Sequence, residues 1–299
     1  MNVEMFFKGG LSMNKHIKLI ILTNNVVGES NYLAEHGLSI LIQIESGEKK
    51  ENYLLDCGKE FFTLQHNMKE YGISPKSFPF RAIILSHGHY DHTGGLKGLL
   101  DASEKNISII GHPDVFINRI SYVGGFRTIS NPFNPSEIIS SGGELLLTKD
   151  SVEINAYLRT TGEIPRMNKF EKNPSFRKVT SGHFLSDEVD DDLSVIINVD
   201  KESFFLLCGC CHAGLVNTLE RAKQLTGKSK CYGIMGGLHL IGASQERIDF
   251  TISELKKWDP EVILPLHCSG KEAMCQLMLH FPKKTKLLNC GDIFTFEIY

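Results

Sequence analysis

The sequence predicts a mixed α/β (α+β) protein in which helices cover β-sheets. Two observations carry this prediction. Short strands rich in Ile and Leu alternate with segments of helical periodicity, and most strands of the last third lead into a short turn that contains Gly or His. Because no linker or internal repeat interrupts this alternation, we expect one domain over residues 1–299, with active residues at the carboxyl ends of strands.

The first third of the chain predicts strands that lead into a βα unit. Strands are expected over residues 16–23, 38–44, 52–56, 81–86 and 107–110. Phe61, Leu64 and Met68 recur at helical spacing and Gly72 follows them, which predicts a helix between the third and fourth strands. A second helix is expected over residues 96–103. The residues before Met13 carry no pattern, so Met13 is an alternative start.

The middle of the chain is less regular. Glycines and prolines, Gly124 among them, predict hairpins and turns over residues 119–150. Residues 162–192 are polar, contain Pro174 and show no period, which predicts an irregular, lid-like insertion. The acidic run at its end, residues 187–192, is expected to be a solvated loop.

Regular alternation returns in the last third. Strands are expected over residues 193–199, 203–208, 231–235 and 262–266. Helices are expected over residues 215–225, 244–258 and 271–279.

Composition excludes several classes of protein. Hydrophobic residues make up 41% and charged residues 22% of the chain, a globular balance that argues against disorder. The formal net charge of −3 gives no electrostatic reason for binding nucleic acid. The chain has no apolar run near the roughly 18–20 residues that span a bilayer. We therefore expect a cytoplasmic protein with a small-molecule substrate and no membrane partner, and a homo-oligomer is compatible with these observations.

The eight cysteines are scattered and predict reduced, mostly buried thiols. Cys208, Cys210, Cys211 and His212 look like a zinc knuckle. A second ligand pair at finger-like spacing is missing from the sequence, so a closed structural zinc site is not expected.

One run of residues carries metal chemistry. His87, His89, Asp91 and His92 follow a buried strand within six positions, and imidazole and carboxylate suit zinc, iron or manganese. A loop can turn the first two towards one point and the last two towards another, which suggests two metals roughly 3.5 to 4 Å apart.

Such a loop cannot fill two coordination spheres alone. His212 and His267 each stand just past a predicted strand, in the same kind of position as the first cluster, and are the preferred further ligands. His239 also follows a strand and could be a ligand, a proton donor or a substrate contact.

Other polar residues are weaker candidates. Asp56 could orient a ligand imidazole or cap the next helix. Glu163 and Arg166 open the lid-like insertion, and Arg166 could hold a substrate phosphate or carboxylate. Four histidines carry no signal in the sequence: His16, His36, His66 and His280. His112, expected to open a helix, and His183 carry little more.

The run from Ser86 to Gly95 closely resembles the signature of the metallo-β-lactamase superfamily, and Asp56-Cys57-Gly58 and the His267 turn fit the same order. The resemblance implies a four-layer αββα sandwich with a dinuclear metal site along one edge. Elements throughout the chain resemble the dihydropterin ribofuranosyl-aminobenzene phosphate synthase-like subgroup: Asn24-Asn25, Glu35–Ser39, Thr161–Arg166, Gly209–Gly214, Gly236–Leu240 and Leu266–Gly270. The subgroup's named activity joins a pterin methyl pyrophosphate to an aryl ribose phosphate.

Two positions depart from the superfamily pattern. Cys210 stands where a bridging aspartate is usual, so either its thiolate bridges the metals or no protein bridge exists. Glu163 stands near the usual place of a third-motif histidine, for which His212 would substitute.

The resulting hypothesis is a metal-dependent hydrolase or pyrophosphate-releasing transferase acting on a small phosphorylated or ester-like substrate. His87, His89 and His212 would hold one divalent metal, and Asp91, His92 and His267 the other, with Cys210 as an additional ligand. Zinc is the preferred metal, with iron, manganese or magnesium as alternatives, and Asp91 and His239 are the candidate catalytic residues. A lactonase or thioesterase of the same fold and a non-catalytic metal-loaded sensor or binding module are the alternatives.

Overall fold

The computed structural model describes residues 15–28, 31–122, 125–172 and 176–299. Met13, Gly124 and Pro174, which entered the predictions above, lie outside these ranges.

A seven-stranded sheet gathers most of the first half of the chain and the last strand. Its strands, in spatial order, are β16 (Ile293–Ile298), β1 (Lys15–Thr23), β2 (Ser39–Ser46), β3 (Lys49–Leu55), β4 (Phe80–Ile84), β5 (Ile107–Gly111) and β8 (Gly143–Leu147). The strands from β16 to β3 pair antiparallel, and those from β3 to β8 pair parallel. The helices α1 (Phe61–Glu70) and α3 (Leu96–Ala102) lie in the connections between its parallel strands.

The last third of the chain builds most of a five-stranded sheet. Its order is β15 (Val262–Leu266), β14 (Lys230–Gly237), β13 (Ser203–Cys208), β12 (Ser194–Asn198) and β9 (Leu158–Thr160). β13, β14 and β15 run parallel, so their carboxyl ends meet at one edge. The helices that follow these three strands are α5 (Leu215–Thr226), α6 (Gln245–Trp258) and α7 (Lys271–His280).

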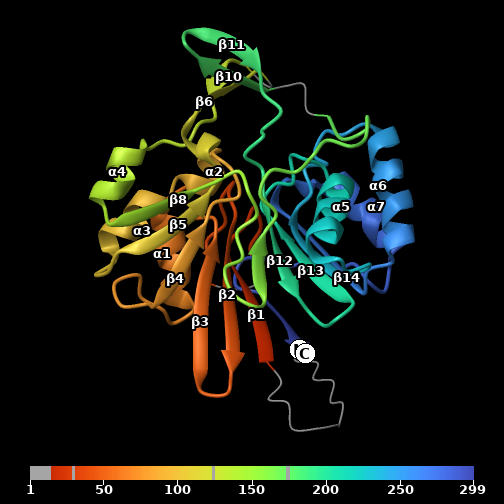
Figure 1. Cartoon of the computed structure of the whole chain (residues 1–299), viewed down its shortest axis with the longest axis horizontal. Helices are drawn as coiled ribbons and strands as arrows, with labels where there is room; N and C mark the ends of the chain where they lie inside the picture. The colour runs from red at the N-terminus through yellow and green to blue at the C-terminus, as the bar shows by residue number, and fades with distance from the viewer. Residues whose placement is uncertain (1–14, 29–30, 123–124, 173–175) are drawn as a thin grey trace.

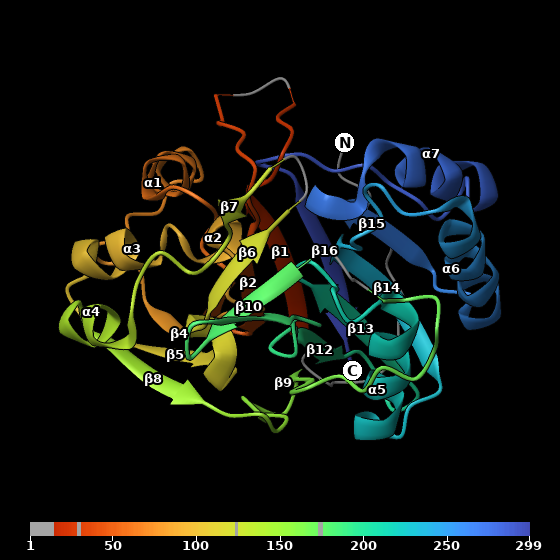
Figure 2. The same cartoon turned by 90° about the horizontal axis from the view of Figure 1, so that it is seen from above.

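The two sheets pack face to face between two helical layers. Leu19 of β1 joins Leu207 of β13 in the core between the sheets, while Ile20 of β1 faces Leu64 of α1. Helices α1 and α3 cover the outer face of one sheet and α5, α6 and α7 that of the other (Figures 1 and 2). Strands buried on both faces explain the continuous apolar runs in the sequence. The predicted four-layer αββα sandwich is confirmed.

Several elements differ from the sequence-based expectation, α4 (Pro135–Ser140) and β16 among them. Helix α4 lies where only hairpins and turns were expected. Asn134 accepts a hydrogen bond from the Glu137 backbone while the Glu137 side chain accepts one from the Asn134 backbone, so a capping box starts a helix too short to show a period. β16 was not predicted, although apolar and polar residues alternate in it from Phe294 to Ile298.

A four-stranded antiparallel sheet, which we call the arm, projects beyond the sandwich (Figure 1). It consists of β11 (His183–Ser186), β10 (Phe176–Thr180), β6 (Asn118–Ser121) and β7 (Arg127–Thr128). The hairpin of β10 and β11 shows that the irregular insertion predicted over residues 162–192 is partly regular. Seen from above, the arm crosses between the two helical layers (Figure 2).

The acidic run after β11 is not a solvated loop, and that prediction was wrong. Asp187, Asp191 and Asp192 are buried. The buried Arg119 of β6 donates to Asp187 at 2.7 Å and to Asp191 at 2.6 Å, so the run anchors the arm to the sandwich.

The thiol prediction is confirmed: all eight cysteines are free and only Cys275 is exposed. Within the described ranges, every helix is too short or too polar to cross a membrane.

Candidate metal centre

The candidate centre begins with the loop after β4. Strand β4 ends at Ile84, and the loop that follows leads to α2 (Tyr90–Thr93), a single helical turn with His89 at its N-cap position. This turn directs Asp91 and His92 inward. All four predicted ligands of the run are at least nine-tenths buried.

Three imidazoles form the first cluster. The Nε2 atom of His87 lies 2.9 Å from Nδ1 of His89 and 3.2 Å from Nε2 of His212, which arrives from the turn after β13. Burial, followed by the neighbouring imidazoles, lowers the pKa of His87 and His212 well below the usual value. These rings are therefore neutral, the form in which imidazole binds a metal.

Asp91 organises a second cluster on the other side of the loop. Its Oδ2 atom lies 3.4 Å from Nε2 of His267 and 3.2 Å from Nε2 of His36. Burial alone would raise the pKa of Asp91, but the hydrogen bonds from His267 and His36 outweigh it and hold the pKa well below its usual range. His92 adjoins this cluster, with its Nε2 atom 3.3 Å from Nε2 of His267.

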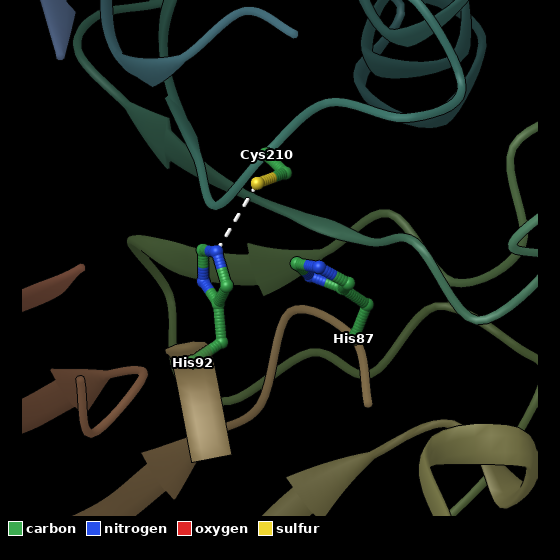
Figure 3. Close-up of side chains that lie close together, drawn as sticks. All are labelled: His87, His92 and Cys210. Carbon is green, nitrogen blue, oxygen red and sulfur yellow. Dashed lines mark hydrogen bonds between the residues drawn. The ribbon is translucent and has the colours of Figure 1, made fainter. Parts of the chain in front are cut away.

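Cys210 lies between the two clusters. Figure 3 shows its thiol directed at the ring of His92, with His87 beside them. The Sγ atom is 3.1 Å from Nε2 of His92, and one atom from each of His87, His92 and Cys210 lies within 4.8 Å of the others.

Polar neighbours fix the ligand rings. Asp56 accepts hydrogen bonds from Nδ1 of His92 at 2.6 Å and from the hydroxyl of Ser86 at 2.7 Å, which directs Nε2 of His92 towards the clusters. Burial opposes the charged form of His92, but the carboxylates of Asp56 and Asp91 outweigh it and raise its pKa to about 9. On the other side, Oδ1 of Asn25 lies 2.8 Å from Nδ1 of His267.

Left-handed backbone marks the turns that carry these residues. Asp56, Cys211, His239 and His267 have φ values of 59°, 61°, 44° and 48°. Such a conformation costs a non-glycine residue about 1–3 kcal/mol and persists where the surrounding structure imposes it, often at functional sites. Each of these residues stands in the turn after a different strand of the two sheets.

The donor set fits divalent metal ions. Imidazoles converge with a carboxylate and a thiol in a buried space, the combination of ligand types that zinc prefers. Nε2 of His89 is buried and lacks a hydrogen-bond partner among the described residues, a cost that a ligand would remove.

Two predicted substrate-binding residues lie in a separate group. Glu163 pairs with His112 and Lys149, each at 2.8 Å. Arg166 donates to the backbone carbonyls of Ile164, Glu188 and Val189. Both line a cavity of about 410 Å³ together with Arg221.

Sequence reasoning overlooked residues that surround the centre. His36 was not predicted as a site residue, yet it reaches Asp91 from a loop. The one available signal was its place in Glu35–Ser39, one of the segments that resemble the subgroup. Phe176 of the arm packs against His89 and His212, with ring centroids 5.3 and 5.4 Å apart. Arg127 of the arm and Tyr90 line a second cavity of about 450 Å³ beside the metal-binding loop.

Comparison with known proteins agrees with this arrangement. Residues 34–164 match the family described as the metallo-β-lactamase superfamily. The chain is 34% identical to 7,8-dihydropterin-6-methyl-4-(β-D-ribofuranosyl)-aminobenzene-5'-phosphate synthase of Methanocaldococcus jannaschii, over 94% of this chain and 97% of that protein. It is 30% identical to an uncharacterised protein of the same organism, over 86% of this chain and 92% of that one.

A solved structure shares the fold. Tm1679, described as a metal-dependent hydrolase of the β-lactamase superfamily, superposes with a TM-score of 0.77 at 21% identity, over 93% of this chain and 98% of its own.

Proposed function

The chain belongs to the metallo-β-lactamase superfamily, and from this premise we propose that it is a metal-dependent transferase that releases pyrophosphate from a small phosphorylated substrate. The observation that carries the proposal is the 34% identity to a named synthase across nearly the whole of both chains. Hydrolysis of the same class of substrate is the second candidate, since Tm1679, which shares the fold, is described as a hydrolase.

The proposed metal ligands follow the two clusters. His87, His89 and His212 would hold one divalent ion, and Asp91, His92 and His267 the other, with the Cys210 thiol next to both. When bound, such ions act as Lewis acids, activate water and neutralise charge on a leaving group. Zinc is the proposed metal because imidazole, carboxylate and thiolate together suit it.

Side chains of the centre have distinct tasks in this proposal. If only one ion is bound, Asp91 is the candidate base, and its Oδ2 atom, 3.4 Å from Nε2 of His267, would accept a proton from the attacking group. His239, the other candidate catalytic residue, lies against His212 with ring centroids 4.1 Å apart.

The cavity beside the metal-binding loop suits a phosphorylated substrate. Tyr90, which stands between two proposed ligands in the sequence, lines it together with Arg127, Asn118 and Thr128. A planar guanidinium binds phosphate oxygens in pairs. Phe176 of the arm packs against the rings of His89 and His212 and would limit the access of bulk water from that side.

The test is acceptor-dependent release of pyrophosphate. Purified protein loaded in turn with zinc, iron, manganese and magnesium is given a dihydropterin-6-methyl diphosphate, with and without 4-(ribofuranosyl)aminobenzene 5'-phosphate. Pyrophosphate released only with the acceptor, together with a coupled product seen by mass spectrometry, supports the transferase. Equal release without the acceptor supports the hydrolase, and no release with any metal contradicts both.

A wider substrate panel that adds phosphoesters, lactones and thioesters tests the earlier alternatives, which the named relatives do not favour. Turnover of lactones or thioesters, unchanged when Arg166 is replaced by Ala, would favour a lactonase or thioesterase. Full metal loading without turnover of any substrate would indicate a sensor. Independence from nucleic acid and membranes, a cytoplasmic location and a homo-oligomeric state stay predictions.

A further inference from the structure

Two buried thiols meet at the carboxyl ends of neighbouring strands. Cys210 follows β13, Cys268 follows β15, and β14 lies between these strands. The thiol of Cys268 is 3.4 Å from the backbone carbonyl oxygen of Cys210. Both residues are at least nine-tenths buried, so their thiols are shielded from bulk water and their polar neighbours all come from the protein.

Because Gly237 at the end of β14 has no side chain, the Cys268 turn can approach Cys210. A Cβ atom at this position would lie 2.6 Å from Sγ of Cys268 and 2.5 Å from the carbonyl oxygen of Gly209. Both distances are too short for a side chain, so a larger residue would push the Cys268 turn away from Cys210.

His239 completes the group from the turn after β14. One ring nitrogen of His239 and the sulfur atoms of Cys210 and Cys268 all lie within 4.8 Å of one another. The left-handed backbone of His239, with φ 44°, brings the ring to this position. Its Nδ1 atom is buried and has no hydrogen-bond partner within the part of the chain that the structure describes.

We propose that Cys210, Cys268 and His239 bind a thiophilic divalent cation of the zinc class. Two sulfurs and one imidazole form three corners of the tetrahedron that zinc prefers, and the fourth position remains for water or substrate. His239 is only half-buried, which leaves this side open to entry. Because soft thiolates select zinc over magnesium or calcium, this site differs in preference from the carboxylate cluster around Asp91.

Cys210 links this thiolate site to the imidazole cluster, since its sulfur also lies 3.1 Å from Nε2 of His92. The inference does not depend on the reaction proposed above. It assigns His239 a ligand role, which excludes proton transfer by the same ring nitrogen.

Titration of the metal-free full-length protein with cobalt(II) under anaerobic conditions tests the proposal. Cobalt replaces zinc, and bound thiolates add a sulfur-to-cobalt charge-transfer band in the near ultraviolet. The wild type should show this band, Cys268→Ser about half its intensity, and the Cys210→Ser, Cys268→Ser double variant none. Cys231→Ser, a buried cysteine outside the group, and the exposed Cys275→Ser serve as matched controls and should keep the full band.

A second measurement needs no variant. Zinc should slow alkylation of Cys210 and Cys268 in the wild type, as read by peptide mass spectrometry, and leave the rates of Cys231 and Cys275 unchanged. An undiminished band in Cys268→Ser, or metal binding without protection of these two thiols, would overturn the site. So would a Cys210–Cys268 disulfide that persists while the protein binds its full complement of metal. A sulfur-to-cobalt band in a protein that releases no pyrophosphate would support the thiolate site and contradict only the proposed reaction.

Discussion

The Nδ1 atom of His92 lies 2.6 Å from Oδ2 of Asp56, and both side chains are completely buried. This contact fixes the ring so that Nε2 faces Cys210 and His267. A carboxylate behind a histidine also makes the imidazole a better metal ligand.

Replacing Asp56 by Asn keeps an acceptor but removes the charge. We expect the affinity for zinc to fall by about 10- to 100-fold, because loss of an orienting carboxylate commonly has this effect. Competition with a chromogenic chelator measures it. Asp101→Asn, which changes an exposed carboxylate paired with Lys97, is the control, and equal affinity in both variants would contradict the orienting role.

Replacing His89 by Ala removes one ligand of the imidazole cluster. Metal content, measured by elemental analysis, and catalytic rate should both fall, the rate by at least about 100-fold, since loss of a ligand should cost no less than loss of its supporting partner. His280→Ala, at the exposed end of α7, should change neither. Activity retained without bound metal is incompatible with the proposed function.

The buried Arg119 should matter more for stability than for chemistry. Above the pKa of Asp191, at about pH 8, Arg119→Leu leaves the Asp187 and Asp191 carboxylates buried without their cation, which should lower the free energy of unfolding by about 3–5 kcal/mol. Urea denaturation measures the change. Lys230→Leu breaks an exposed pair with Glu202 and should leave the free energy of unfolding almost unchanged. Similar losses in the two variants would show that the arm is anchored by other contacts.

The raised pKa of Asp191 predicts that the stability of the fold depends on pH. Burial, only partly offset by Arg119 and reinforced by Asp187, raises its pKa to about 7 from 3.8. The folded state therefore holds a proton that the unfolded state has lost, so this contribution to stability is complete below the unfolded pKa and is lost as the pH rises towards 7. Asn at this position cannot ionise. The difference in unfolding free energy between Asp191→Asn and the wild type should shift in favour of the variant between about pH 4 and pH 7. A constant difference would mean that Asp191 stays ionised throughout.

Elements with a clear period were predictable from the sequence, and so were ligands that stand together. His87 to His92 form one run, and His212 and His267 follow strands whose carboxyl ends had to meet at one edge. The burial of Arg119 was not predictable, because its partners lie 68 and 72 residues further along the chain. The same holds for His36, which approaches Asp91 from an exposed loop without any period.

The meeting of Cys210 with Cys268 depends on packing rather than on spacing. These residues are 58 positions apart, and only the glycine at the end of β14 permits the approach. Short elements were not predicted from the sequence for a related reason. Helix α4 depends on its cap and β10 on its pairing with β6, and neither is long enough to display a period.

The pairing of β1 with β16 has a consequence for how the molecule forms. Lys15 lies opposite Ile298, so the first strand of the described chain keeps an open edge until the last one has arrived. Contacts between residues so distant in sequence slow folding, because the chain loses the entropy of a very long loop before the contact stabilises it. During synthesis on the ribosome β1 cannot gain this neighbour until β16, at residues 293–298, has emerged. Until then a row of unpaired backbone groups on β1 is available to other chains, which makes aggregation of nascent protein the characteristic risk of this fold.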